Sequence, residues 1–335
     1  GRMKRGDEVM FGRSPVEEYG EASRARRVSK IHAHRPRSAR TRFWAAFGPV
    51  CRVLQRQRWP SERSSGPMSQ ATQDSELHVR YEAEGPLAIL TLDRPDARNA
   101  YSEAMCEQLV AAFDRADRDD AIRCVILTGA GSAFHAGGDV KAMKARSGMF
   151  AGEPDELRER YIQGIQAVPR RIAEFRKPLI AAINGAAIGA GLDLACMCDL
   201  RIAAASAKLG STFVAVGLVP GDGGAFFLAR VVGFAKALEL MLTARVLGAN
   251  EALAIGLVGE VVADAQLMAS ARERALAIAK HPALAVQLTK RAAYRSWAGD
   301  QAAALELAAT YQGIVQNHAD HLRALGLPVE ARKQS

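Results

Sequence analysis

Two short runs of small residues in this chain are placed where backbone amides could hold a negatively charged oxygen. Gly137–Gly138 follows the apolar stretch Ile122–Gly129, and Gly189–Gly191 follows Lys177–Asn184. Both runs lead into stretches with a helical pattern, and the first turn of a helix presents N–H groups that lack partners and favour negative charge. Losing one such donor typically lowers a reaction rate by about 10²–10³. The alternative is that these residues only permit tight packing, which is the commoner role of Gly-rich turns.

A regular series of strands and helices would position these runs. Two short strands around the turn Glu84–Pro86 predict a β-hairpin, and a helix is expected from Ser102 to about Asp117. A second helix is expected over 156–175, because Leu157, Tyr161, Ile165, Val168 and Ile172 are spaced along one helical face. Pro169 should kink that helix. Further strands are predicted at 122–129, 177–184 and 200–205, with a short extended piece at 208–212.

The repetition of similar units indicates one large α/β domain. Strand, strand and helix recur in that order, which predicts a right-handed stack with a buried core over residues 68–249. From Asn250 onward the pattern is mostly helical, with helices expected at 264–280, 283–297 and 300–317 and one strand at "LVGEVV". We expect residues 250–335 to pack on the core and on a neighbouring subunit.

Several motifs, in order and spacing, resemble the enoyl-CoA hydratase/isomerase (crotonase) family. "RPDARNA" is similar to the early CoA-contacting loop of that family, and "AFHAGGD" is similar to its first oxyanion loop. "KPLIAAINGAAIGAGLDLACMCDLRIA" and "VGLVPGDGGAFFLARVVG" resemble its second oxyanion loop and the turn that follows. The resemblance covers residues 77–335. It implies an α/β fold built as a right-handed spiral of strand–strand–helix units with a C-terminal helical subdomain.

The resemblance also implies roles for individual residues. Gly138 and Ala190 match the positions whose N–H groups hold the thioester oxygen, and Ala in place of the usual Gly at 190 keeps the main-chain donor. The implied partners are an acyl-CoA or enoyl-CoA substrate and further copies of the chain in a homotrimer or homohexamer. The resemblance implies that Arg98 and Lys141 lie near the CoA phosphates, but plain surface charge explains these two residues equally well. A structural role is favoured for Asp199 and Asp139. The residues on the substrate and CoA side are Arg98, Ala136, Gly137, Asp139, Lys141, Gly189 and Phe213.

Acid–base chemistry is where this sequence departs from the hydratases of the family, which use two Glu residues. The first of these positions is Asp193 here, and the second is Phe213, which cannot transfer a proton. Asp222 replaces a residue that is often small and lines the same cavity, so Asp193 and Asp222 could form a relocated pair. One positioned carboxylate contributes about 10²–10⁴ in rate and suffices to move a proton between two carbons, whereas hydration needs a second group near the water.

Purely structural roles for the two carboxylates stay open at this stage. Asp193 could cap its helix or pair with Arg201, and Asp222 could be the N-cap of a helix over 223–232. The sequence is therefore compatible with an enoyl-CoA hydratase or isomerase, with an isomerase that lacks hydratase activity, and with a non-catalytic acyl-CoA-binding homologue. The non-catalytic interpretation is suggested by Phe213.

Composition changes sharply at Met68. Residues 1–67 contain sixteen Lys and Arg against six Asp and Glu, whereas residues 68–335 contain 29 against 30. The net charge of +9 therefore comes from a basic leader, which we expect not to fold by itself. Translated upstream sequence before a natural start at Met68 is favoured over an organelle transit peptide. Because no aromatic-interleaved module accompanies its Arg clusters, we do not expect nucleic acid as a partner.

The remaining composition argues for a cytoplasmic enzyme without a metal or redox cofactor. The five cysteines form neither an even disulfide framework nor a Cys-x-x-Cys pair, which indicates a reducing compartment. No run of eighteen apolar residues is present, so no membrane-spanning helix is expected. The His residues are scattered, and no metal or dinucleotide motif follows a strand, so coenzyme A is expected only as part of the substrate.

Overall fold

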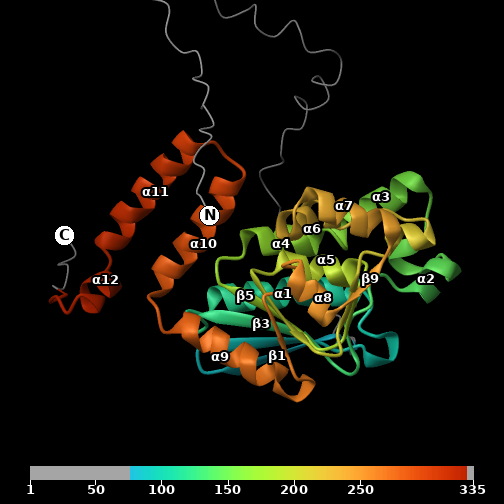
Figure 1. The fold of residues 1–335 in the computed structure, drawn as a ribbon, viewed down its shortest axis with the longest axis horizontal. Coiled ribbons are helices and arrows are strands. Elements are labelled where there is room, and N and C mark those ends of the chain that lie inside the picture. The colour runs from blue at the N-terminus through green and yellow to red at the C-terminus, as the bar shows by residue number, and fades with distance from the viewer. Residues whose placement is uncertain (1–75, 330–335) are drawn as a thin grey trace, which may run out of the picture. The chain divides into compact units, whose positions relative to one another are not determined.

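The computed structural model describes residues 76–329, which belong to one compact unit (Figure 1). The basic leader predicted at residues 1–67 lies outside the described residues, as do the first residues predicted for the core and the last six residues of the chain. Among residues 76–329, no helix combines the length and apolar composition needed to span a bilayer. The same residues contain no group of three or more His, Cys, Asp or Glu side chains suited to hold a metal ion.

A six-stranded sheet forms the centre of the unit. Its order is β1-β2-β3-β5-β7-β10; β1 and β2 form the predicted antiparallel hairpin, and the remaining neighbours pair in parallel. Residues Leu87–Leu92 are buried at every position, as expected for a strand covered on both faces. The strands are β1 (Val79–Glu84), β2 (Leu87–Leu92), β3 (Cys124–Gly129), β5 (Leu179–Ile183), β7 (Leu200–Ala204) and β10 (Glu260–Val262).

A second sheet of four short strands, in the order β4-β6-β8-β9, is built from the same repeating units. The pairs β3–β4, β5–β6 and β7–β8 each send one strand to the large sheet and the next to the small sheet before a helix, so the spiral of strand–strand–helix units expected from the sequence is confirmed. The short strands are β4 (Ala133–His135), β6 (Ala186–Ile188), β8 (Lys208–Gly210) and β9 (Val246–Gly248).

Helices cover both faces of the large sheet. On one face, α1 (Glu103–Arg118), α4 (Ala167–Glu174), α5 (Ala190–Met197) and α6 (Gly224–Val232) pack in succession, and on the other α9 (Leu267–Ala279) crosses β2, β3, β5 and β7 (Figure 1). Alternate residues of β2, β3, β5 and β7 belong to two separate cores: Leu90 and Leu127 face α1, whereas Ile89 and Ile126 face α9. Every residue of α5 is buried, which places this helix deep between the sheet and α6.

The helix predicted over residues 156–175 is wrong, because two helices occupy this stretch. After α2 (Val140–Ala145), α3 (Pro154–Gln163) ends at Gly164, and α4 begins at Ala167 with Pro169 in its first turn. Proline lacks the N–H that would bond to the carbonyl four residues earlier, and its ring displaces that carbonyl. Pro169 therefore disfavours a continuous helix, and it is accommodated in the first turn of α4 after a break at Gly164.

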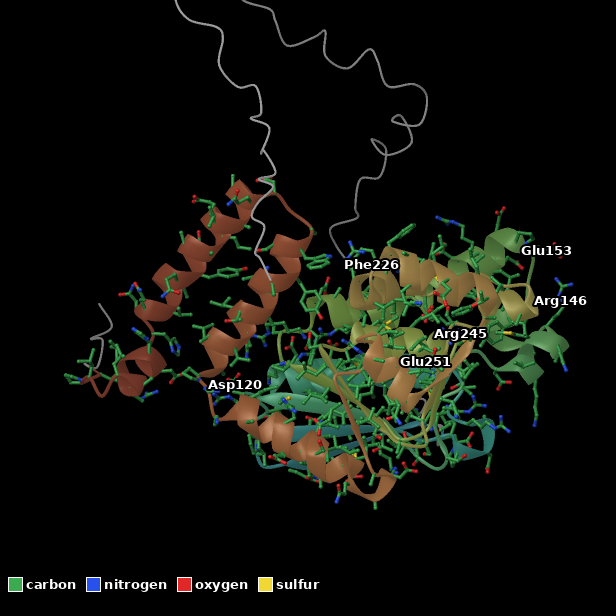
Figure 2. The ribbon with its side chains drawn as sticks, in the orientation of Figure 1. Asp120, Arg146, Glu153, Phe226, Arg245 and Glu251 are labelled. Atoms are coloured by element: carbon green, nitrogen blue, oxygen red, sulfur yellow. The ribbon has the colours of Figure 1, made fainter. Side chains whose placement is uncertain are left out.

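The boundary expected at residues 249–250 does not coincide with a structural division, because β10 and α9 belong to the core. Between α7 (Phe234–Thr243) and α8 (Ala249–Ala254), Arg245 bonds to Glu239 and Glu251 and ties these elements together (Figure 2). Lys290 and Tyr294 reach Asp199 at 2.7 and 2.9 Å, which holds α10 on the core. The last helices are α10 (Ala283–Trp297), α11 (Gln301–Gln316) and α12 (Ala319–Ala324).

Candidate active site

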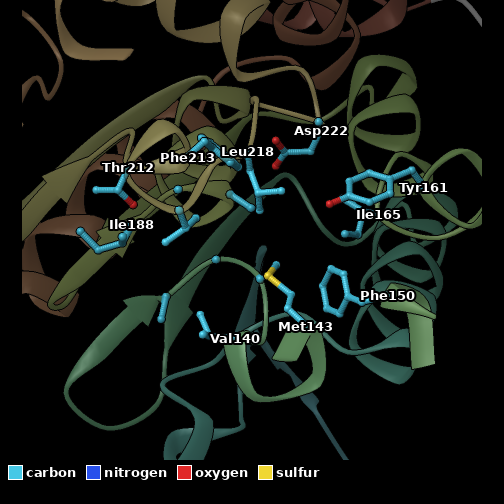
Figure 3. A pocket seen from close by; sticks show the side chains of 17 residues that line it. Val140, Met143, Phe150, Tyr161, Ile165, Ile188, Thr212, Phe213, Leu218 and Asp222 are labelled. Atoms are coloured by element: carbon cyan, nitrogen blue, oxygen red, sulfur yellow. The ribbon is translucent and has the colours of Figure 1, made fainter. Parts of the chain in front are cut away.

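A cavity of about 150 Å³ lies between the two small-residue runs, α2, α3 and the loop before α6 (Figure 3). A space of this volume can hold a group as large as benzene. It therefore suits a small apolar molecule or the acyl part of a larger one. Most of the side chains that line it are apolar, among them Val140, Met143, Phe150, Ile165, Phe213 and Leu218.

The two small-residue runs meet at one wall of this cavity. β4 and β6 pair in parallel, so their carboxyl ends lie together. A Cβ on Gly137, whose φ is +90°, would lie 2.7 Å from the Ile188 carbonyl oxygen and 3.3 Å from the Ala190 nitrogen. A Cβ on Gly191 would lie 1.9 Å from the His135 carbonyl oxygen. These contacts leave no room for larger side chains, so glycine at both positions is what allows the runs to approach each other.

The amides of Gly138 and Ala190 are free at this wall. No carbonyl among residues 76–329 accepts a hydrogen bond from either N–H, and both residues line the cavity. Ala190 is the first residue of α5, where helix geometry leaves the N–H without a partner and the helix dipole favours negative charge. Two donors that are close together, free and next to a small apolar space can stabilise an anionic oxygen.

His135 fixes the first of these runs from behind. Its Nδ1 accepts the Gly137 N–H at 2.8 Å, so the ring proton is on Nε2, and its ring packs edge-on against Tyr101 at 4.3 Å between centroids. The Tyr101 N–H in turn bonds to the Gly137 carbonyl at 2.9 Å. Burial lowers the pKa of His135 to about 3, so the imidazole is neutral and Nδ1 stays an acceptor at neutral pH. The Gly137 peptide is thus held on both sides, which orients the following Gly138 amide.

Two buried carboxyl groups, those of Asp193 and Asp222, stand together next to the cavity. Asp193 is the fourth residue of α5 and is fully buried, and Asp222 is 3% exposed in the loop before α6. The Asp193 carboxyl packs so closely on Gly224 that a Cβ there would lie 2.0 Å from its Oδ2. The two groups lie close to each other, and no N–H or O–H of another described residue satisfies their oxygens.

This burial makes the two carboxyl groups hold their protons more tightly than exposed Asp side chains do. Burial, followed by the charge of Asp222, raises the pKa of Asp193 well above its usual value, and burial raises the pKa of Asp222. Two adjacent carboxylates in a desolvated site cannot both ionise near neutral pH, because each negative charge disfavours the other. The pair is therefore equipped to accept and donate a proton near neutral pH.

The structural alternatives for these two residues are wrong, and so is one part of the catalytic expectation. Arg201 donates to the carbonyls of Leu257 and Cys198 and not to Asp193, and α6 has no side-chain cap. Asp222 lines the cavity, whereas Asp193 does not and lies behind it. The expectation that Asp193 stands directly beside the two amides is corrected accordingly, because its position one turn into a fully buried helix withdraws it from the cavity wall.

The residues expected on the CoA side divide into two groups. Ala136, Gly137, Gly189 and Phe213 line the cavity. Arg98, Asp139 and Lys141 do not, and Arg98 and Lys141 are exposed. Asp139 accepts the N–H groups of Lys141 and Ala142 at the start of α2 and pairs with Arg94 at 3.3 Å. These contacts give Asp139 the capping role that its place before the helix favours.

Sequence reasoning missed two residues of the site. His135 is part of the motif "AFHAGGD", but nothing in the motif shows that its ring accepts a hydrogen bond from the Gly137 amide, two residues later. Tyr161 was expected on the apolar stripe of one long helix. Because α3 ends at Gly164, Tyr161 instead lines the cavity, and Figure 3 shows its hydroxyl pointing inward. In the sequence, only Pro169 indicated that the long helix would be interrupted.

Comparison with known proteins agrees with the fold and with the arrangement of the site. Residues 82–335 match the family described as enoyl-CoA hydratase/isomerase. The chain is 37% identical over 257 residues to a short-chain-enoyl-CoA hydratase of Clostridium acetobutylicum, covering 76% of this chain and 96% of that one. It is 36% identical over 232 residues to a 1,2-epoxyphenylacetyl-CoA isomerase of Escherichia coli, covering 69% and 87%.

Solved structures give the same result. An enoyl-CoA hydratase from Bacillus anthracis aligns with a TM-score of 0.70 at 33% identity, covering 75% of this chain and 95% of that chain. An enoyl-CoA hydratase from Mycobacterium smegmatis aligns with a TM-score of 0.70 at 31% identity, covering 75% and 95%. Since the match extends over most of this chain and nearly the full length of these relatives, the chain belongs to the enoyl-CoA hydratase/isomerase family of acyl-CoA-processing enzymes.

Proposed function

We propose that this enzyme shifts the double bond of an enoyl-CoA thioester. The observation that carries the proposal is the position of Asp222, whose carboxyl lines an apolar cavity that also exposes the free amides of Gly138 and Ala190. A thioester whose carbonyl oxygen is held by the two amides becomes acidic at its α-carbon, because the enolate charge collects on that oxygen. A carboxyl group next to that carbon can then move the proton.

The reaction needs no group beyond those named. Ionised Asp222 removes a proton from the α-carbon of a 3-enoyl thioester, and the electron pair forms a dienolate whose oxygen accepts hydrogen bonds from Gly138 and Ala190. The protonated Asp222 then returns the proton to the γ-carbon, which leaves a 2-enoyl thioester and restores the carboxylate. Asp193, which lies behind Asp222, lowers the pKa of that carboxyl against the effect of burial. Coenzyme A enters only as part of the substrate.

Hydration is the second candidate, because relatives at 36 and 37% identity are called crotonyl-CoA hydratase and short-chain-enoyl-CoA hydratase. It requires a water molecule at the β-carbon and a group to activate that water. Phe213 occupies the position of the second Glu in the hydratases that the chain resembles, and its ring lies in the cavity wall. An apolar ring cannot activate water, which is why we favour the double-bond shift. A non-catalytic acyl-CoA-binding role would leave the isolated carboxyl pair without a purpose.

The outer contacts of the substrate are proposed by resemblance. We place the CoA phosphates near the exposed side chains of Arg98 and Lys141, and the pantetheine along residues 136–141. A homotrimer or homohexamer is proposed because the C-terminal helices carry large apolar side chains, such as Trp297 and Leu305, that are 70 and 63% exposed. We also propose that the enzyme acts in the cytoplasm.

The test compares two substrates with the same protein. Crotonyl-CoA and but-3-enoyl-CoA are supplied in parallel in D₂O, and products are separated by chromatography and examined for deuterium. We expect but-3-enoyl-CoA to become crotonyl-CoA, and we expect no 3-hydroxybutyryl-CoA to form from either substrate. Formation of the hydroxy thioester without double-bond shift would overturn the proposal in favour of hydration. Binding of both thioesters without any exchange at carbon would overturn it in favour of a non-catalytic role.

A further inference from the structure

The cavity has a second polar group that the proposed reaction does not use. Tyr161, in the last turn of α3, lines the cavity and is half-buried. Figure 3 shows its hydroxyl directed into the space below Asp222, on the side of Ile165 and Phe150. In the same view Ile188 and Thr212 lie on the other side. Ile188 is followed by the Gly189–Ala190 run, so Tyr161 faces that run across the cavity.

The hydroxyl of Tyr161 is an available hydrogen-bond donor. Burial and the nearby charge of Asp222 raise the pKa of Tyr161, and no hydrogen bond to another group contributes to that shift. The group is therefore a protonated phenol at any pH at which the enzyme is expected to work. A phenolic O–H both donates and accepts, and no hydrogen bond joins this one to a protein acceptor among residues 76–329.

The ring of Tyr161 is also held firmly in place. A Cβ on Gly221 would lie 2.7 Å from its Cε1, so the ring packs directly on the residue that precedes Asp222. The position of the hydroxyl is thus tied to the loop that carries the proposed acid–base group. A flexible surface tyrosine would turn its hydroxyl toward solvent, whereas this one presents it to the space where an acyl chain has to lie.

The direction of the acyl chain follows from the two ends of the cavity. With the thioester oxygen at Gly138 and Ala190, the α-carbon lies next to that wall and the rest of the chain extends toward Tyr161. A hydrocarbon chain would exclude water from the hydroxyl and offer it no acceptor. Leaving a buried donor unsatisfied weakens binding on the order of ten-fold to a hundred-fold. An acyl chain with an oxygen atom at this place avoids that loss.

We infer that Tyr161 selects enoyl-CoA substrates whose acyl chain carries an oxygen atom beyond the β-carbon, such as a hydroxyl, ether or carbonyl oxygen. This inference rests on the proposed function, since it uses the orientation that the two amides and Asp222 give to the thioester. Discrimination of this kind is strong wherever a site contains a polar group that only one of two substrates of equal size can satisfy.

The experiment pairs substrates and variants. Short enoyl-CoA thioesters with a terminal hydroxyl are compared with thioesters of the same length that end in a methyl group, and kcat/KM is measured for the wild type, Tyr161→Phe and Tyr311→Phe. Phe at 161 keeps the ring on Gly221 and removes only the hydroxyl. Tyr311, on α11, lies outside the cavity lining and provides the same chemical change as a control.

We expect the wild type and Tyr311→Phe to favour the hydroxylated member of at least one pair by roughly ten-fold or more in kcat/KM. In Tyr161→Phe that preference should disappear, because kcat/KM rises for the methyl thioester, whose chain no longer buries an unsatisfied donor, and does not rise for the hydroxylated thioester. Equal loss on both members of every pair would overturn the inference and make Tyr161 a packing residue. Equal use of both members by the wild type would overturn it as well.

The inference and the proposed function fail in different ways. If Asp222→Asn retains full double-bond shift, the proposed function fails whatever Tyr161 does. If Asp222→Asn is inactive and the wild type does not distinguish the paired thioesters, only the selectivity assigned to Tyr161 fails. Should Tyr161→Phe instead lower only the addition of water to crotonyl-CoA, the hydroxyl holds a water molecule and the inference is overturned.

Discussion

The two amides and the two carboxyl groups of this site are built in different ways. The amides of Gly138 and Ala190 are set by the backbone: parallel pairing of β4 and β6 and the small size of the residues around them decide where they point. The carboxyl groups of Asp193 and Asp222 are set by side chains from two elements, and their chemistry depends on burial and on the lack of other donors.

This difference explains what each part tolerates. A main-chain donor survives exchange of its own side chain, so alanine at 190 keeps the N–H that the proposed oxyanion site needs. A carboxyl pair has no such freedom, because its proton affinity depends on both partners and on the volume around them. Glycine at 224 is an example, since any side chain there would enter the space of the Asp193 carboxyl. The amide corner should therefore respond to backbone changes, and the pair to isosteric side-chain changes.

The largest effect is expected from Asp222→Asn. Asparagine keeps the shape of the side chain and can still bond to Asp193, but it cannot carry a proton. We expect the rate of double-bond shift to fall by about 10²–10⁴ while thioester binding changes little. Deuterium exchange at the α-carbon measures the loss. Asp120→Asn, the same exchange at an exposed position labelled in Figure 2, is the control, and equal rates for both variants would remove Asp222 from the mechanism.

The next largest effect is expected from Ala190→Pro, which tests the proposed role of the backbone amides. Proline is tolerated at the first position of a helix because the N–H that it lacks has no partner there. Here it removes the proposed donor and leaves α5 in place. We expect kcat to fall by about 10²–10³, whereas Ala190→Gly, which keeps the N–H, should stay within a few-fold of the wild type. If proline and glycine at 190 act alike and the melting temperature is unchanged, the amide does not hold the oxyanion.

The contrast between features set by the local backbone and features set by distant side chains also decides how much of the molecule could be predicted from the sequence. The β1–β2 hairpin, the repeated strand–strand–helix units and the two small-residue runs depend on local patterns of apolar and small residues, and the structure has all of them. Backbone register brings Gly138 and Ala190 together once the strands pair. The close approach at Gly137 and Gly191 follows from the same local pattern, since both lack a side chain.

Features that depend on contacts between distant segments were not predicted. Helix α7 was missed, because only its packing against α6 makes a core stripe of Ala237 and Leu240. Tyr161 was assigned to a core stripe, because periodicity alone does not show that the helix ends at Gly164 and turns this side chain into the cavity. Nor does spacing show that Asp222, and not Asp193, forms the cavity wall.

A smaller effect is expected from His135, which positions the first amide through Gly137. His135→Phe keeps the ring against Tyr101 but removes the acceptor, whereas His135→Asn places an oxygen where Nδ1 was. We expect Phe to lower kcat by roughly ten-fold with little change in KM, and Asn to restore most of the rate. Because the pKa of His135 is about 3, the pH profile should be the same in the wild type and in His135→Asn. Equal rates for the two variants would limit His135 to packing.

The smallest effect in rate, but the clearest in pH, is expected from Asp193→Asn. Asp193, whose pKa is raised further, keeps its proton at the pH at which Asp222 ionises, and it lowers the pKa of that carboxyl. The Asn amide is a weaker donor than a carboxylic acid, so the pKa of Asp222 should rise and the acid limb of the pH–rate profile should move to higher pH, with kcat at its plateau within about ten-fold of the wild type. A limb that stays in place would mean that burial alone sets the pKa of Asp222.

Stability provides an independent check of the same pair. Because the folded pKa values of Asp193 and Asp222 are raised, the native protein retains a proton that the unfolded chain releases above the ordinary Asp pKa of about 3.9. The stability that this proton provides is complete below that value and is lost as pH rises through the folded pKa. Asp193→Asn removes one of these carboxyl groups, so its melting temperature relative to the wild type should rise between about pH 5 and about pH 8. A constant difference over that range would show that the two carboxyl groups titrate independently of folding, and the amide corner would then be the only preorganised half of the site.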